Sequence, residues 1–415
     1  MAQSIHSLTS SPPASEPRSG LIAAGTTPLH RLDGGLWVDV VDLQTANSMH
    51  GAAWDDLAAN ACDPNAFFER WFLNAAMPAF ERGRQLAIAC VYRGSSRKDV
   101  APGLVGLFPI EVAPRRGCLS RTLRMFSHEY AFLLTPLIRQ GHAVETWETF
   151  LDWADQRSGC DVIELSQIRG DGAVAKALAE VVYRRPAPSL VSSIHTRAVL
   201  RRSPSAEESL SAALTTKQRH EYSRQTRRLS ELGPLEFRRM ESQSEAGQWI
   251  DWFIELESRG WKGEAGTALA EDAVAREFFT KSLLGAAQHD RLQALGMWLN
   301  GRPIALKLNL LAGPGSFAFK IAYDEEFYKF SPGVLLELEN VRILHDHCDA
   351  AWMDSCAAPN HPMINRIWRD RVLMQQILLS TGTKRGNLAV GFRPLGRVLR
   401  HMFKRKPVAA PTPAK

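Results

Sequence analysis

A run of apolar segments between residues 292 and 324 limits the possible folds of this chain more than any other feature. The segments LQALGMWL and PIALKLNLL are separated by Asn300-Gly301, followed by Arg302, and Asn-Gly between alternating segments is a strong signal for a tight hairpin. The residues GPGS at 313–316 then lead into a third alternating segment, FAFKIAYD. Strands joined by tight turns pair antiparallel, so the sequence predicts an antiparallel meander.

The rest of the chain shows a similar mixture of strand and helix patterns. A length of 415 residues is more than one ordinary core needs and predicts two domains. We therefore predict an α+β fold with two units, each a mainly antiparallel mixed sheet flanked by helices. The predicted parts are a disordered leader rich in Ser, Pro, Ala and Gly at 1–30, domains at 31–204 and 205–400, and a basic, disordered tail at 401–415.

Hydrophobic periodicity and turn signals divide the two domains into elements. Predicted strands lie at 36–43, 85–93, 103–112, 160–168, 192–201, 234–240, 292–299, 303–311, 317–324 and 350–356, with a closing strand near 387–394. Predicted helices lie around Trp54 and at 64–80, 144–157, 172–183, 206–232, 242–259, 332–346 and 362–380.

Charge and motif content narrow the classes of function. The net charge of +6 and pI near 9.0 suit anionic ligands such as phosphates without requiring nucleic acid. Six cysteines without a Cys-x-x-Cys pair predict reduced thiols in a cytoplasmic protein, and no apolar run has the length of a membrane span. Nucleotide hydrolysis, nicotinamide chemistry and serine hydrolysis lack their usual motifs.

The joint KIAYDEEFYKFSPGVLLELENV at 320–341 is the strongest candidate site. Strict alternation would place Phe317, Phe319, Ile321 and Tyr323 on one apolar face. Ser331 then fits an N-cap, Pro332 a first helical residue, and Gly333 removes a crowding Cβ. The first turn of such a helix can hold a phosphate, although an ordinary helix start explains the same residues.

Two further segments accompany this joint, LESRGWKGEAGTAL at 256–269 and MDSCAAPNHPMINRIWRDR at 353–371. Together the three segments resemble the CelD-like acetyltransferase domain of the GNAT acyltransferase superfamily, which is related to the FemABX transferases. The resemblance implies two tandem GNAT-like domains, no permanently bound cofactor, and an acyl-CoA such as acetyl-CoA as co-substrate in the C-terminal domain. It further implies transfer to an amine or hydroxyl of a small molecule or glycan in exopolysaccharide or envelope synthesis.

The resemblance also assigns site residues. Cofactor contacts would come from Lys320 on the strand and from Ser331, Gly333, Val334 and Leu335 at the turn. This turn has one glycine in place of the Gln/Arg-x-x-Gly-x-Gly/Ala signature of typical GNAT enzymes.

Acyl transfer to an amine needs a base and an acid for the departing thiolate. We assign Asp324 or Glu257 as the base and Tyr323 as the acid, against the alternatives of a core tyrosine and a solvated helix charge.

Acceptor contacts are predicted on both domains. Trp261 and Lys262 should border the acceptor cleft, with a core tryptophan and a surface lysine as the alternatives. In FSHEYAFLLTPL at 126–137, we predict that His128, Glu129 and Tyr130 form a cleft wall, with a loop cap and a satisfied core histidine as the alternative.

Two basic segments leave other partners open. The segment 215–229 is either a solvated helix face or a surface for an acidic acceptor, a phosphorylated carrier or tRNA, and tRNA would fit a FemABX-like aminoacyl transferase. The segment 395–406 could rest on an anionic membrane or pack on the domain. A non-catalytic scaffold is a third possibility, and the spacing of His345 and His347 does not favour a metal site.

Overall fold

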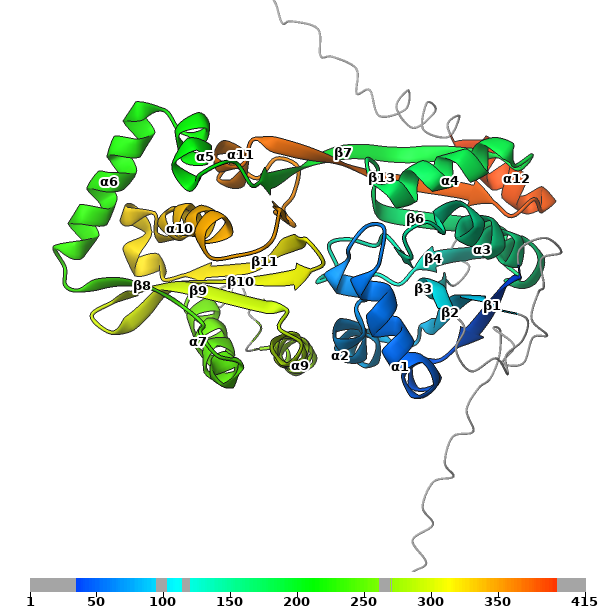
Figure 1. Cartoon of the computed structure of the whole chain (residues 1–415), viewed down its shortest axis with the longest axis horizontal. Coiled ribbons are helices and arrows are strands. Elements are labelled where there is room, and N and C mark those ends of the chain that lie inside the picture. The colour runs from blue at the N-terminus through cyan, green and yellow to red at the C-terminus, as the bar shows by residue number, and fades with distance from the viewer. Residues whose placement is uncertain (1–34, 95–102, 114–119, 261–268, 270, 394–415) are drawn as a thin grey trace, which may run out of the picture.

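The computed structural model describes residues 35–94, 103–113, 120–260, 269 and 271–393. These residues form one elongated body around a 13-stranded mixed sheet, with helices packed against both faces (Figure 1). The predicted α+β class, with two tandem and mainly antiparallel units flanked by helices, is confirmed.

The first repeat contains the elements from residue 36 to residue 201. In chain order they are β1 (Leu36–Val41), α1 (Leu43–Ala59), η1 (Ala66–Phe68), α2 (Arg70–Phe80), β2 (Gln85–Arg93), β3 (Gly103–Ala113), β4 (Thr122–Met125), β5 (Leu137–Ile138), α3 (Ala143–Arg157), β6 (Val162–Arg169), α4 (Ala173–Arg184) and β7 (Ser189–Arg201). Two helices, α5 (Ala206–Ala213) and α6 (Thr216–Ser230), then lead to the second repeat.

The second repeat has the same order of strands and helices. It consists of β8 (Leu235–Arg239), η2 (Gln243–Glu245), α7 (Ala246–Ser258), α9 (Ala273–Gln288), β9 (Leu292–Leu299), β10 (Arg302–Ala312), β11 (Gly315–Tyr323), η3 (Glu325–Phe330), α10 (Pro332–Asp346), β12 (Trp352–Asp354), α11 (Ile364–Ile367) and β13 (Asp370–Ser380), followed by α12 (Lys384–Gly391). Apart from the two-residue β5 and the short 3-10 helices, each repeat therefore reads strand, two helices, three strands, helix, strand, helix, strand.

Strand pairing interlocks the repeats. The strand order is β1-β2-β3-β4-β6-β13-β7-β12-β11-β10-β9-β8. The last strand of each repeat thus pairs with the other repeat, because β13 lies between β6 and β7 and β7 also pairs with β12. The predicted boundary at residue 204 falls between β7 and α5. Backbone hydrogen bonds join strands from the two sides of this boundary, because β13 pairs with β6 and β7, and β12 pairs with β7.

The predicted meander is confirmed. Asn300 and Gly301 have φ angles of 53° and 76°, which is the left-handed pair that a type I′ hairpin turn requires. The turn pairs β9 antiparallel to β10, and β10 pairs antiparallel to β11. One apolar core extends through both repeats, and Phe72 on α2 meets Phe278 on α9 edge to face at 5.5 Å.

The predicted alternation of β11 is wrong beyond Phe319. The register with β10 shifts at this point, because Leu308 opposes Lys320 whereas Asn309 opposes Ala318, which leaves Phe319 as the extra residue of a β-bulge. Phe317 and Phe319 enter the large core, but Ile321 packs in a different cluster beneath α10. The bulge therefore reverses the faces of the sheet to which the side chains after Phe319 point.

The local sequence pattern also predicted the wrong secondary structure near the C-terminus. The helix predicted at 362–380 is the short α11 followed by β13, and the closing strand predicted near 387–394 is the helix α12. The segment 370–380 has a helical pattern but lies in the middle of the sheet with both edges paired, so tertiary pairing overrides local preference. The helix predicted at 206–232 is divided by a capping box of Thr215 and Gln218 into α5 and α6, and α9 was not predicted.

Candidate functional site

An open strand edge in the second repeat is the first component of the site. β12 pairs with β11 only from Gly315 to Phe317, and the two strands then diverge. Among the residues that the structure describes, no strand pairs with the side of β11 that faces away from β10 between residues 318 and 323. Such an edge can hydrogen-bond an extended ligand that carries amide groups.

The edge leads to the start of α10. Ser331 lies in the left-handed region, with φ of 53°, and its carbonyl accepts from the N–H groups of Val334 and Leu335 at 2.9 and 3.1 Å. Ser331 occupies the N-cap position, but its side chain does not cap the helix as the sequence predicts. The first turn carries no acidic residue, and since Pro332 has no N–H, only Gly333 has an N–H that is not bonded to Ser331, at the positive end of the helix dipole.

Close packing explains the glycine in this turn. A Cβ at Gly333 would lie 3.2 Å from the ring of Tyr323, so the predicted cofactor residue Gly333 and the predicted acid Tyr323 are neighbours. Leu335 is buried in the cluster beneath α10, so only its backbone faces the turn, and Val334 is half-buried.

Asp324 is held by two contacts that shape the same turn. Its carboxylate accepts from the Glu326 N–H at 3.1 Å and forms an ion pair with Arg302. The side chain is buried, and it caps η3. Asp324 and Tyr323 therefore lie at the helix end of the open edge.

A second group of predicted residues meets at the junction of the repeats. The Lys320 ammonium lies 4.5 Å from the ring centre of Tyr130, so a β11 residue contacts the first repeat directly. Burial, followed by the negative charges of Glu129, Glu257 and Asp272, raises the pKa of the Tyr130 hydroxyl, which keeps its proton at neutral pH. Glu257 is buried and accepts from the Leu269 N–H at 3.1 Å. The predicted acceptor residues Trp261 and Lys262 lie outside the described residues.

His128 is a packing group inside this junction. Its ring stacks on Phe80 at 4.4 Å and also contacts Phe72 and Phe278. Neither ring nitrogen has a hydrogen-bond partner among the described residues, unlike the satisfied core histidine that the sequence allows. Burial, with a smaller effect of the Arg84 charge, lowers the pKa of His128 to about 3, so the ring is neutral. Glu129 is exposed beside it.

The corresponding edge of the first repeat is closed. β4 ends at Met125, and the chain leaves the sheet through residues 126–136, which we call the inserted segment, before it rejoins β3 as β5. Within this segment the Leu134 N–H donates to the Gln167 carbonyl at 3.0 Å, and the Thr135 hydroxyl accepts from the Arg169 N–H at 3.0 Å. The inserted segment thus fills the gap between β4 and β6.

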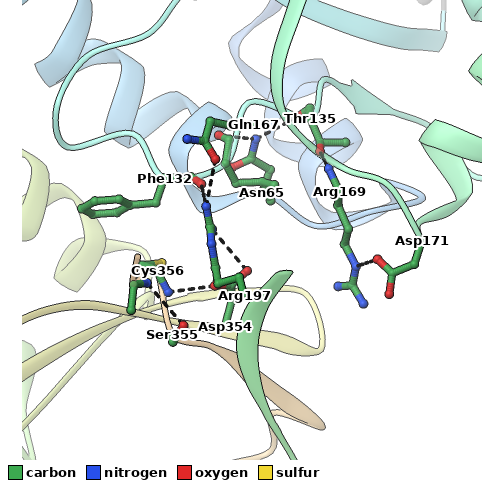
Figure 2. Close-up of polar contacts among 12 residues, drawn as sticks. Asn65, Phe132, Thr135, Gln167, Arg169, Asp171, Arg197, Asp354, Ser355 and Cys356 are labelled. Carbon is green, nitrogen blue, oxygen red and sulfur yellow. Dashed lines mark hydrogen bonds and ion pairs between the residues drawn. The ribbon is translucent and has the colours of Figure 1, made fainter. Parts of the chain in front are cut away.

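A buried polar cluster ties the inserted segment to both repeats (Figure 2). Arg197 on β7 donates to the Phe132 carbonyl at 2.7 Å and to the Gln167 side chain at 3.0 Å, and it pairs with Asp354 at 3.4 Å. Asp354 in turn accepts from the Cys356 N–H at 2.8 Å. Gln167 and Cys356 both have left-handed φ angles, of 51° and 52°, which are uncommon for such residues and often occur at functional sites.

A second buried network supports the inner face of α10. Lys307 and Glu337 form an ion pair of 2.8 Å with both side chains almost fully buried, and Glu337 also accepts from Asn340 and Trp368. Sequence reasoning missed this pair and the Arg197 cluster, because their members are far apart in the chain and no short motif contains them. Lys307 offered one signal, a charged residue within an otherwise apolar strand.

Three arginines of the basic stripe of α6 form ion pairs within the chain. Arg224 pairs with Glu221 at 2.7 Å, Arg219 with Glu207 at 3.5 Å and Arg227 with Glu231 at 3.9 Å. These exposed pairs favour a solvated helix face. The basic segment at 395–406 lies outside the described residues, and none of the described helices is long and apolar enough to span a bilayer.

Comparison with known proteins identifies the domain that carries the open edge. Residues 216–356 match the family described as "Acetyltransferase (GNAT) domain", a range that includes β11, the start of α10 and β12. This part of the chain therefore has a GNAT-type acyltransferase fold. None of the curated proteins compared with the chain matches it.

Several solved structures are similar to the chain at low identity. FemX has a TM-score of 0.49 and 9% identity, over 79% of this chain and 95% of its own. A conserved protein of unknown function from Bacteroides thetaiotaomicron has a TM-score of 0.48 and 8% identity, over 83% and 99%. A tandem GNAT protein from the clavulanic acid biosynthesis pathway has a TM-score of 0.40 and 15% identity, over 84% and 99%.

Proposed function

We propose that this protein transfers an acyl group from acyl-CoA to an amine or hydroxyl, with the donor bound in the second repeat. The observation that carries the proposal is the open edge of β11, which leads directly to the N-terminus of α10 inside the GNAT-type domain. The resemblance to CelD-like proteins supports a glycan or envelope precursor as the acceptor.

The donor would use both parts of this arrangement. Its pantetheine amides would hydrogen-bond along the edge between residues 318 and 323, and its pyrophosphate would accept from the Gly333 N–H at the positive end of the α10 dipole. The thioester would then lie toward Lys320 and the diverging ends of β11 and β12.

This orientation separates two groups of polar residues. Tyr323 and Asp324 would lie at the pyrophosphate end, whereas Tyr130 contacts Lys320, and Glu257 is close enough for its charge to raise the Tyr130 pKa. We therefore favour Glu257 as the base that takes a proton from the acceptor, because Asp324 would lie at the pyrophosphate end and forms an ion pair with Arg302 there. The acceptor atom attacks the thioester carbonyl carbon, the carbon–sulfur bond breaks, and Tyr130, which holds its proton at neutral pH, can protonate the thiolate.

Calorimetric titration of acetyl-CoA and of a longer acyl-CoA tests the donor site. We expect wild type and Gly333→Ala to bind both ligands, and Gly333→Asp to bind neither, because the added carboxylate repels the pyrophosphate. Gly333→Ala is the matched control, since it adds the same Cβ next to Tyr323 without a charge. If wild type binds no acyl-CoA, or if Gly333→Asp binds as well as Gly333→Ala, the start of α10 is an ordinary helix start and the proposal fails.

A further inference from the structure

The two ends of the large sheet differ in how they meet solvent. At one end the residues of β1 are mostly buried, including Leu36, Trp37 and Val38. At the other end β8 pairs with β9 alone, and within the described ranges no strand pairs with its outer edge (Figure 1). Four of the five residues of β8 are exposed.

The hydrogen bonds to β9 determine which groups this edge presents. The Pro234 carbonyl accepts from the Asn300 N–H at 3.0 Å, and the Met240 N–H donates to the Ala294 carbonyl at 2.9 Å. In an antiparallel pair the N–H and C=O groups of alternate residues point to the same side. Even-numbered residues of β8 therefore face β9, and the backbone groups of Leu235, Phe237 and Arg239 point outward.

We propose that two copies of this chain associate by antiparallel pairing of β8 with β8, centred on Phe237. In this register Phe237 opposes Phe237 of the second copy, and Leu235 opposes Arg239 of the second copy. All of these are outward-facing residues, so three pairs would exchange about six backbone hydrogen bonds.

The charges of β8 are complementary in the same register. Glu236 opposes Arg238 of the second copy in a non-hydrogen-bonded pair, which is the type of pair in which side chains lie closest. By the twofold symmetry of the dimer, Arg238 of the first copy also opposes Glu236 of the second copy. Charged residues on an edge strand usually prevent pairing, but here the order Glu236, Phe237, Arg238 makes the strand complementary to itself.

A groove beside β8 would receive the central aromatic residues. It has a volume of about 470 Å³, and its lining includes Phe237, Glu339, Ile343 and His347. The Phe237 side chain is 39% exposed, which leaves an apolar surface that the second copy would cover. A pair of five-residue strands is small compared with a standard interface, so we expect dissociation in the roughly micromolar range.

Sedimentation velocity of the full chain from about 1 to 100 µM tests this proposal. We expect a dimer in wild type and a monomer in Phe237→Pro, because proline removes an outward N–H and leaves the ladder to β9 intact. Arg238→Glu would place like charges opposite each other and weaken the dimer at least about tenfold. The double variant Glu236→Arg with Arg238→Glu restores opposite charges and should restore the dimer.

The double variant Glu236→Arg with Arg238→Glu keeps the test decisive if Phe237→Pro fails to fold. It retains a Glu–Arg pair within each chain, so we expect it to fold as wild type does. Thermal unfolding of each variant serves as the folding control, since Arg238 also lies over Trp298. A wild type that is monomeric throughout this range overturns the proposal. A dimer that Arg238→Glu does not weaken, or that the double variant does not restore, also overturns it.

Discussion

The two repeats share their order of elements and their order of strands, but they treat one strand edge in opposite ways. In the second repeat, β11 continues for nine residues and leaves its outer edge open as it approaches α10. In the first repeat, the corresponding strand stops after four residues, and the inserted segment at 126–136 bonds to β6 instead. The second repeat thus leaves this edge open, and the first repeat closes it with a segment that contacts the second repeat.

The helices that follow these strands, α3 and α10, differ in the charge of their first turns. The first turn of α3 carries Glu145, whose carboxylate contacts the His142 ring, so a negative charge already occupies the positive end of that helix. The first turn of α10 has no acidic residue. An anionic ligand therefore has one suitable helix start among these two.

The largest effect should come from placing one carboxylate at the same position of each helix. Gly333 and Val144 are both the second residue of their helices. We expect Gly333→Asp to weaken acetyl-CoA binding by roughly 1,000-fold, about 4 kcal/mol, and Val144→Asp to leave it unchanged. Calorimetry on wild type should also give one acyl-CoA per chain. Two binding sites per chain, or equal losses in both variants, would contradict the difference between the repeats.

A smaller effect should reveal how deeply the inserted segment is buried. The pKa of His128 is lowered to about 3 in the folded chain and is near 6.5 when unfolded. The unfolded state therefore binds more protons between these values, and the folded state loses stability as the pH falls. We expect a loss of about 3 kcal/mol from this group between pH 6.5 and 4.

Urea unfolding at several pH values measures this loss, with His128→Phe as the matched variant that keeps an aromatic ring against Phe80. The readout is the pH slope rather than the absolute free energy of unfolding. Identical slopes for wild type and His128→Phe would mean that the histidine is hydrated in solution.

The contribution of Glu69 to folding stability should have the opposite pH dependence. It precedes α2 in the first repeat and faces Arg291 of the second at 3.5 Å, and burial outweighs that charge and raises the pKa of Glu69 to about 7. The folded state then binds more protons between about pH 4.5 and 7, so stability falls as the pH rises. We expect a loss of roughly 2 to 3 kcal/mol between pH 5 and 8.

The variant Glu69→Gln cannot ionise and keeps an oxygen that can accept from the Trp71 indole. It should therefore lose less stability than wild type over this pH range in the same urea experiments. If stability of the wild type rises from pH 5 to 8 relative to Glu69→Gln, the pair with Arg291 dominates and the junction is more polar than its burial indicates.

Local signals in the sequence predicted those parts of the fold that local physics determines. Asn300-Gly301 predicted a hairpin and Pro332 a helix start, because both depend on a few adjacent residues. Strand β13 was predicted as a helix, since its state depends on β6 and β7, which are nearly 200 residues away. The bulge at Phe319 was missed for a similar reason, because it exists only in register with β10.

In the candidate site, too, the sequence predicted neighbours within one continuous segment but not contacts between distant segments. Gly333 and Tyr323 were predicted and lie together, because they belong to one continuous joint. Tyr130 and Lys320 were also both predicted, but for different roles, and the sequence had no means to show that they touch. Arg197 was not predicted at all, because its partners Phe132, Gln167 and Asp354 come from three separate segments.

The smallest effect tests whether the inserted segment of the first repeat is energetically coupled to the open edge of the second. In a double-mutant cycle with Tyr130→Leu and Lys320→Met, we expect a coupling of about 0.5 to 1 kcal/mol in the free energy of unfolding, the range of a cation over an aromatic ring. A second cycle with Tyr130→Phe keeps the ring and should show almost no coupling to Lys320→Met. A coupling near zero in the first cycle would mean that the two groups are adjacent without interacting. The inserted segment would then act on the proposed donor site by shape, through contacts such as the packing of Phe132 against Phe319 of β11.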